Sequence, residues 1–260
     1  MAEVILVDSK EAAGELVADH IGGLVDANPE TVLGVATGST PLPVYEALGA
    51  RADAGLDFSR VSAYALDEYV GLPVEHPESY RSVITKEFQD RVGADPSRVH
   101  VPDGSLDGIQ TAGERYESLL AASGGVDLQL LGLGTTGHIG FNEPGSSFGS
   151  LTRVKTLTEQ TRVDNARFFD SLDEVPIHCV TQGLGTILRA RHLVLLAFGE
   201  GKAEALAASV EGAVSSSMPG SAIQLHPHVT VLVDEAAASQ LKNLDYYRWA
   251  TAHKPDWQGI

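Results

Sequence analysis

The feature that most constrains the fold of this 260-residue chain is a regular alternation of short β-branched runs with helix-like segments. Strands are expected at residues 4–7, 31–36, 61–66, 126–133, 192–198 and 228–233. Strands separated by helices are typical of a mostly parallel sheet with helices on both faces. Because no linker or repeat divides the sequence, we expect one catalytic α/β domain, Rossmann-like, across residues 1–260.

The first expected helix begins after Ser9, whose hydroxyl can accept a hydrogen bond from the first turn. Its apolar spacing predicts an inward face that contains Ala12, Leu16, His20 and Leu24.

The charge balance narrows the classes of partner. Eighteen basic against 35 acidic side chains give a formal charge of −17, which disfavours nucleic acid and anionic membrane surfaces. The N-terminus lacks the basic start of a signal peptide, and the longest apolar run is too short to span a membrane. Cys179 is the only cysteine, which excludes an intrachain disulfide framework. We therefore expect a cytoplasmic protein.

Three polar clusters follow predicted strands, at residues 37–40, 67–69 and 134–150. In open parallel sheets, ligands bind beyond the carboxyl ends of the strands. We therefore expect these three clusters, although far apart in the sequence, to converge at one edge of the sheet.

Two of the clusters contain glycine-rich stretches. Residues 132–137 (GLGTTG) match the dinucleotide-binding fingerprint, but Gly140 and Pro144 interrupt the helix that this fingerprint requires. Gly38, Ser39 and Thr40 lack the Gly-Lys pair of a P-loop. Free N–H groups and hydroxyls before a helix suit a monophosphate, and an ordinary N-cap turn is the equal alternative.

Basic residues are scarce, so their positions carry information. Four lie within fifteen residues, and Lys202 stands at the start of a predicted helix; the four are Arg153, Lys155, Arg162 and Arg167. The helix dipole disfavours a cation at an N-terminus unless an anion also binds there. These residues predict an anion site, with a solvated surface as the alternative.

Asp67 follows an apolar strand, where partial burial would make its pKa adjustable. Such a carboxylate can move a proton between neighbouring carbons, or it can simply cap the next turn. His138 and Glu143 lie five residues apart in a glycine-rich loop, which allows a carboxylate to orient the imidazole as a proton acceptor. Without a nearby third ligand, the pair is a poor metal site.

These residues also carry a family resemblance. The chain resembles glucosamine-6-phosphate deaminase at residues 37–41 (TGSTP), 66–73 (LDEYVGLP), 75–80 (EHPESY), 137–144 (GHIGFNEP), 153–156 (RVKT), 161–163 (TRV), 166–169 (ARFF) and 225–227 (LHP). The resemblance implies a fold of the sugar-phosphate isomerase/deaminase type. It also implies conversion of glucosamine 6-phosphate and water to fructose 6-phosphate and ammonia, with no metal or organic cofactor.

The resemblance further implies roles for single residues. Asp67 would move the proton between C2 and C1, and His138, supported by Glu143, would accept the proton that opens the sugar ring. Phosphate-binding roles would fall to Gly38, Ser39, Thr40, Arg167 and Lys202. An N-acetylglucosamine 6-phosphate effector site, known in regulated hexameric members, would use Ser146, Arg153, Lys155 and Thr156. Other members lack that regulation.

One position departs from the family pattern. Two residues before the histidine the family has Asp or Asn, and this chain has Thr136. Threonine brings no charge and a shorter reach. Our hypothesis is that ring opening is slower or less dependent on pH here, while isomerisation is intact.

Two other functions fit the same fold. A 6-phosphogluconolactonase shares the glycine-rich loop before the histidine, but residues 141–144 (FNEP) have the deaminase form. A non-catalytic sugar-phosphate sensor of a transcription regulator would need a DNA-binding module, whereas the first strand here starts near residue 3 and the chain is acidic.

Overall fold

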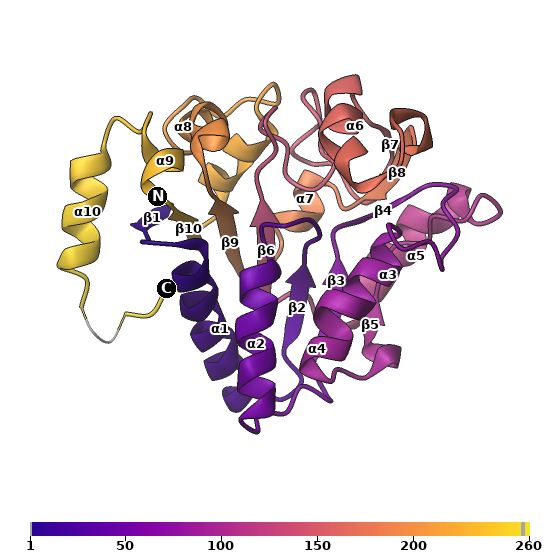
Figure 1. Ribbon diagram of the computed structural model, residues 1–260, viewed down its shortest axis with the longest axis horizontal. Coiled ribbons are helices and arrows are strands. Elements are labelled where there is room, and N and C mark those ends of the chain that lie inside the picture. The colour runs from indigo at the N-terminus through magenta and orange to yellow at the C-terminus, as the bar shows by residue number, and fades with distance from the viewer. Residues whose placement is uncertain (1, 256–257) are drawn as a thin grey trace.

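A seven-stranded sheet forms the centre of the molecule, and its arrows point toward the same end in Figure 1. The computed structural model describes residues 2–255 and 258–260. The strand order is β1-β10-β9-β6-β2-β3-β5, and every neighbouring pair is parallel. The strands are β1 (Glu3–Leu6), β2 (Val32–Val35), β3 (Ser62–Ala65), β5 (Val99–His100), β6 (Leu128–Gly132), β9 (His192–Ala197) and β10 (Val229–Val233).

The parallel α/β fold class is confirmed, and so are all six predicted strands, each to within about two residues at either end. The central strands β2, β9 and β10 are buried along their whole length, as expected for a sheet covered on both faces. Strand β5 was not predicted, because two residues are too few to show a pattern.

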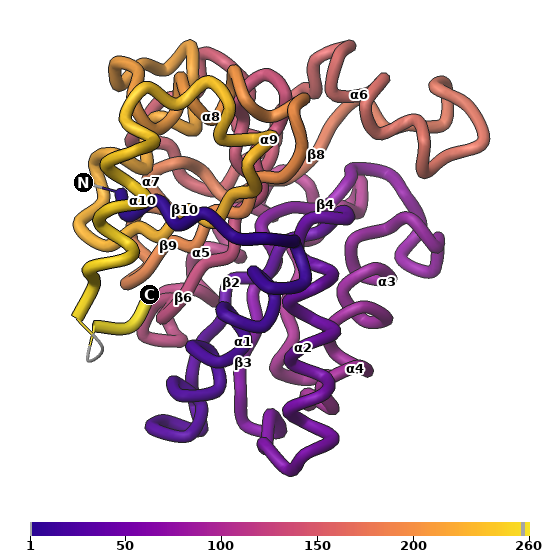
Figure 2. The backbone as a smooth tube through the Cα atoms, turned by 60° about the vertical axis from the view of Figure 1, so that its left-hand side comes forward, coloured from indigo at the N-terminus to yellow at the C-terminus, as the bar shows by residue number. Residues whose placement is uncertain are grey.

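A second, three-stranded sheet was not expected. It has the order β4-β8-β7 and consists of β4 (Asp67–Tyr69), β8 (His178–Thr181) and β7 (Arg153–Thr156), paired antiparallel. Strand β4 begins one residue after Leu66, beyond the carboxyl end of β3. In Figures 1 and 2 the small sheet and the helix α6 lie at the end of the main sheet toward which its strands point.

The helices are α1 (Lys10–Ala27), α2 (Leu42–Asp53), α3 (Tyr80–Ile84), α4 (Asp90–Val92), α5 (Ile109–Ala122), α6 (Glu159–Asn165), α7 (Leu184–Ile187), α8 (Ala203–Val210), α9 (Glu235–Ala238) and α10 (Leu244–Ala252). A π-helical stretch, Thr85–Gln89, joins α3 to α4. Helices α1 and α2 lie side by side on the near face of the sheet in Figure 1. Within the described residues, no helix has the length and apolar character needed to cross a membrane.

Helix α1 is where the sequence analysis misjudged a buried face. The Ser9 hydroxyl does cap the helix, accepting from the Ala12 N–H at 3.0 Å. The predicted inward set is confirmed in part, because Leu16 and Leu24 are partly buried and pack against the core, whereas Ala12 is exposed. The fully buried side includes Ala13, Val17, Ile21 and Val25, one residue further along the helix. Close packing explains the rotation: a β-carbon on Gly14 would stand 2.5 Å from the Pro43 carbonyl oxygen of α2, so the helices meet along the small residues.

Candidate functional site

A cavity of about 660 Å³ lies where the three polar clusters meet. Its lining includes residues 37–40 after β2, Asp67 and Tyr69 of β4, and Gly134, His138 and Gly140 of the loop after β6. The predicted convergence of these clusters at one edge of the sheet is therefore confirmed. The glycine-rich stretch 132–137 forms the end of β6 and a turn, and no helix begins inside it.

Asp67 is the first residue of β4 and is 5% exposed. It lies opposite Thr181 in the antiparallel ladder and faces the cavity. Burial, helped by the negative charge of Glu68, raises the pKa of Asp67 to about 8. A carboxyl group with a pKa near neutrality can both take and return a proton at physiological pH.

The structural role considered for Asp67, capping of the next turn, belongs to its neighbour Glu68. Its carboxylate accepts three backbone hydrogen bonds, from Tyr69 at 2.8 Å and from Tyr80 and Arg81 at 2.9 Å each. Burial raises the pKa of Glu68, while the three N–H donors oppose the rise. Glu68 therefore ties β4 to the first turn of α3 and lies outside the cavity lining.

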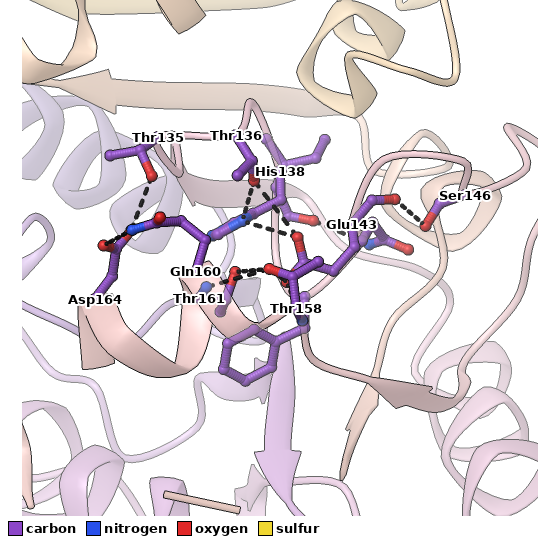
Figure 3. A network of polar contacts seen from close by, with 12 residues as sticks. Thr135, Thr136, His138, Glu143, Ser146, Thr158, Gln160, Thr161 and Asp164 are labelled. Carbon is purple, nitrogen blue, oxygen red and sulfur yellow. Dashed lines mark hydrogen bonds and ion pairs between the residues drawn. The ribbon is translucent and has the colours of Figure 1, made fainter. Parts of the chain in front are cut away.

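His138 and Glu143 face each other across the loop, as predicted (Figure 3). His138 Nδ1 lies 3.5 Å from Glu143 Oε2 and 3.0 Å from Thr136 Oγ1. The other oxygen, Oε1, accepts from the backbone and hydroxyl of Thr158, both at 3.2 Å. Burial alone would raise the pKa of Glu143, but hydrogen bonds from His138 and Thr161 lower it to about 2. Glu143 is therefore an ionised carboxylate beside the imidazole.

The loop that carries His138 runs against all three strands of the small sheet. A β-carbon on Gly140, which has φ +54°, would lie 3.1 Å from Thr181 Oγ1 on β8 and 3.4 Å from Asp67 Oδ2 on β4. The next residue donates its N–H to Thr181 Oγ1 on β8 at 3.1 Å. Asn142 Oδ1 then accepts from Arg153 Nη1 on β7 at 2.7 Å. This crossing holds the imidazole and Asp67 on one cavity.

The five residues predicted to bind phosphate all line the same cavity. Residues 38–40 form the turn before α2, and Gly38 takes φ +86°, which favours glycine. The Tyr45 hydroxyl fixes the start of this turn by bonding both the N–H and the carbonyl of Ala36. Pro41 and Pro43 have no N–H group, and the Val44 and Tyr45 N–H groups donate to the Pro41 carbonyl. The N–H groups available to an anion are therefore those of the turn at residues 38–40, which lines the cavity and for which the described residues provide no acceptor.

Two cations complete this end of the cavity. Lys202 precedes α8, and Arg167 comes from the 3₁₀ turn after α6, where its guanidinium stacks on the Phe168 ring at 4.7 Å. Burial lowers the pKa of the Lys202 amine, and Arg167 lowers it further, while Asp164 opposes the shift. An anion bound between the two cations would relieve this repulsion.

The residues predicted for an effector site lie outside this cavity. Ser146 is buried, and its hydroxyl lies 3.3 Å from Arg153 Nη2. Because side chains alternate along a strand, Arg153 and Lys155 share one face of β7, while Thr156 lies on the other. The structure therefore brings Ser146 and Arg153 together and separates Thr156 from them.

Sequence reasoning missed the aromatic wall of the cavity. The Tyr69 ring packs at a tilt against Tyr80 and Phe141 and edge-to-face against Phe169, and the two tyrosine hydroxyls are 3.4 Å apart. These rings occur inside the motifs that pointed to the site, which was the available signal. Arg162 of the basic run does not reach the cavity lining and instead donates to the carbonyls of Leu172 and Val175.

A known protein family matches most of this chain. Residues 7–232 match the family of glucosamine-6-phosphate isomerases and 6-phosphogluconolactonase. The chain belongs to this family. Its sequence is 61% identical over 260 residues to a glucosamine-6-phosphate deaminase of Streptomyces coelicolor, covering 99% of this chain and 100% of the relative. It is 54% identical over 270 residues to a deaminase of Bifidobacterium longum, with full coverage of both chains.

Solved structures of the glucosamine-6-phosphate isomerase and 6-phosphogluconolactonase family share the fold. One is a monomeric glucosamine-6-phosphate deaminase, with a TM-score of 0.89 and 41% identity over 92% of this chain and all of the other. A 6-phosphogluconolactonase from Leishmania guyanensis has a TM-score of 0.72 at 23% identity, over 91% of this chain and 97% of the other. The lactonase likeness concerns the fold alone.

Proposed function

We propose that this protein converts glucosamine 6-phosphate and water into fructose 6-phosphate and ammonia. One observation carries the proposal: a single cavity presents a buried carboxyl, an imidazole paired with a carboxylate, and two cations, namely Asp67, His138 with Glu143, Arg167 and Lys202. An isomerisation with deamination needs these three functions: carbon-to-carbon proton transfer, ring opening and phosphate binding. Relatives named as glucosamine-6-phosphate deaminases at 54–61% identity over the full chain support it.

The phosphate would bind first, between the turn at residues 38–40 and the cations Arg167 and Lys202. Backbone N–H groups of this turn and two positive side chains together offset the acidic charge of the rest of the protein. Fixing the phosphate would place the sugar ring over Asp67 and His138, which converts their chemistry into an intramolecular reaction.

The chemistry would then proceed in two proton-transfer stages. His138 accepts the hydroxyl proton of the cyclic sugar, and the ring oxygen regains a proton as the ring opens to the aldehyde. Asp67 removes the proton from C2 and returns it to C1, while one proton passes from the C2 amine to the C1 oxygen; the products of this stage are a ketimine at C2 and a hydroxyl at C1. Water adds to that carbon, and ammonia leaves as the ketone forms. Glu143 keeps a negative charge beside the imidazolium that forms at His138.

We further propose that Ser146, Arg153, Lys155 and Thr156 belong to a site for N-acetylglucosamine 6-phosphate, as in the regulated hexameric members. The contact between Ser146 and Arg153 supports it for these two residues, whereas Thr156 lies on the opposite face of β7. A 41%-identical relative is a monomeric deaminase, so a mass measurement with and without the effector should decide the assembly of this chain. We also propose a cytoplasmic location, which the buried free thiol of Cys179 supports.

A coupled assay that detects fructose 6-phosphate tests the proposed function. Glucosamine 6-phosphate is supplied with and without the N-acetylated effector, and 6-phosphogluconolactone is supplied in parallel. We expect turnover of the amino sugar with release of one ammonia for each ketose formed. Turnover of the lactone alone would show that the protein is a lactonase and not a deaminase. Turnover of neither compound would favour a non-catalytic sensor.

A further inference from the structure

An acidic side chain stands beside the two cations of the proposed phosphate site. Asp164 lies one residue before the end of α6, and Arg167 follows it in the 3₁₀ turn that continues this helix. Both residues line the cavity, as does Lys202. Burial lowers the pKa of the Lys202 amine, the Asp164 carboxylate opposes this shift, and Arg167 adds to it. The charge of Asp164 therefore acts on the place where a phosphate would bind.

Uncharged groups hold the Asp164 carboxylate in place (Figure 3). Oδ2 accepts a hydrogen bond from Thr135 Oγ1 at 2.8 Å, and Oδ1 accepts one from Gln160 Nε2 at 2.8 Å. Thr135 belongs to the turn after β6, and Gln160 lies one turn earlier on α6. Both carboxylate oxygens therefore contact neutral donors, which do not neutralise the negative charge of Asp164.

These contacts keep the carboxylate near the cations without pairing it with them. A turn of Asp164 onto Lys202 would break the hydrogen bonds from Thr135 and Gln160. Arg167 is exposed and packs on the Phe168 ring, with its guanidinium carbon 4.7 Å from the ring centre. A phosphate in this part of the cavity would thus be attracted by two positive charges and repelled by one negative charge.

We propose that Asp164 sets the affinity of the phosphate site by weakening the binding of a phosphate dianion. Like charges repel over several ångströms in a partly exposed site, and a dianion experiences twice the repulsion of a monoanion. The fixed carboxylate therefore keeps phosphate esters, the product included, from being retained too strongly. The proposal rests on the proposed function for the presence of a phosphate site, and it goes beyond that function in naming the residue that limits the affinity.

Asp164→Asn is the decisive variant, because the amide can keep both contacts and has no charge. Its oxygen can accept from Thr135, and its NH₂ group can donate to the side-chain oxygen of Gln160 once that amide has turned over. Thr135→Val is the converse variant, since it removes the hydroxyl donor and keeps the charge. Asp170→Asn is the matched control: Asp170 follows Arg167 as closely as Asp164 precedes it, but Asp170 is exposed and outside the cavity lining.

Calorimetric titration of the full chain with fructose 6-phosphate near neutral pH measures the Kd of each variant. At low salt we expect Asp164→Asn to lower Kd about three- to tenfold, and Asp170→Asn to stay within about twofold of the wild type. In about 0.5 M NaCl the gain from Asp164→Asn should shrink to less than about twofold, because salt screens partly exposed charges. Inorganic phosphate should show a gain in the same direction at low salt, since the repulsion acts on the phosphate group.

Two results with Asp164→Asn would overturn the proposal: a wild-type Kd at low salt, or a gain that persists unchanged at high salt. A Thr135→Val variant that binds as tightly as Asp164→Asn would assign the effect to the hydrogen bond and not to the charge, and it contradicts the proposal as well. If the wild type binds fructose 6-phosphate but does not turn over glucosamine 6-phosphate, the proposed function fails, and the titrations still decide the role of Asp164. Thermal melts confirm that each variant folds.

Discussion

Asp67 and Glu68 are neighbours on β4, both buried, and only Glu68 is saturated by backbone donors. Successive side chains of a strand point to opposite faces, so the two carboxyls enter different surroundings. Asp67 faces the cavity with a pKa of about 8, while Glu68 faces the first turn of α3. The fold thus assigns one carboxyl to structure and leaves the other able to exchange protons.

Replacing Asp67 by Asn should abolish turnover and leave sugar-phosphate binding in place. The amide cannot remove a proton from carbon, so we expect kcat to fall at least about a hundredfold. The coupled assay gives kcat, and calorimetric titration with fructose 6-phosphate gives binding. The matched control is Asp57→Asn, since Asp57 is exposed and outside the cavity. Loss of binding in a folded Asp67→Asn variant would place Asp67 in recognition.

The raised pKa of Asp67 also predicts the pH dependence of catalysis. A base must be ionised to act, so kcat/KM of the free enzyme should rise about tenfold per pH unit up to about pH 8 and then level off. Initial rates at low substrate between pH 6 and 9 measure this profile. A flat profile over that range would mean that Asp67 is ionised throughout.

The same pKa shift makes the stability of the fold depend on pH. The folded pKa of about 8 lies above the unfolded value of about 4, so the contribution of Asp67 to the free energy of unfolding is complete below pH 4 and is lost as the pH rises from 4 through 8. Because Asn is always neutral, Asp67→Asn should raise Tm more at pH 8.5 than at pH 4. Calorimetric melts at both values test this. An equal change in Tm at the two pH values contradicts it.

Arg167 and Lys202 should act mainly in binding. Lys202→Met and Arg167→Met each remove a positive charge from the proposed phosphate site, so we expect KM to rise about tenfold or more with a smaller effect on kcat. Lys10→Met is the control, because Lys10 is exposed and paired with Glu11 on the surface. A larger effect on kcat than on KM would instead place the cations in the chemical step.

Thr136→Asp tests the hypothesis that ring opening is slower here than in members with a carboxylate at this position. A second carboxylate beside His138 should make the imidazole a stronger base and should increase kcat and its dependence on pH. If ring opening limits the wild type, the isotope effect from C2-deuterated substrate should grow in the variant. An unchanged rate at every pH would contradict the hypothesis.

The main sheet and the convergence of the site were predictable because both depend on local pattern. The buried strands are continuous apolar runs, and Asp67 and His138 follow two of them in the chain. The small sheet was not predictable, since β4 has only three residues and β7 alternates half-buried and exposed side chains. The Thr136 contact depends on the turn at Gly137, φ +76°, which no sequence pattern reports.

Residues 140–142 contact all three strands of the small sheet, and these contacts fix the length of the stretch. One inserted or deleted residue would shift the stretch by about 3.3 Å and break the hydrogen bonds from Phe141 to Thr181 and from Arg153 to Asn142. Length variation can be absorbed at the exposed turn of residues 53–55, far from the cavity lining. The number of residues between His138 and Asn142 is therefore as important for function as the identity of either side chain.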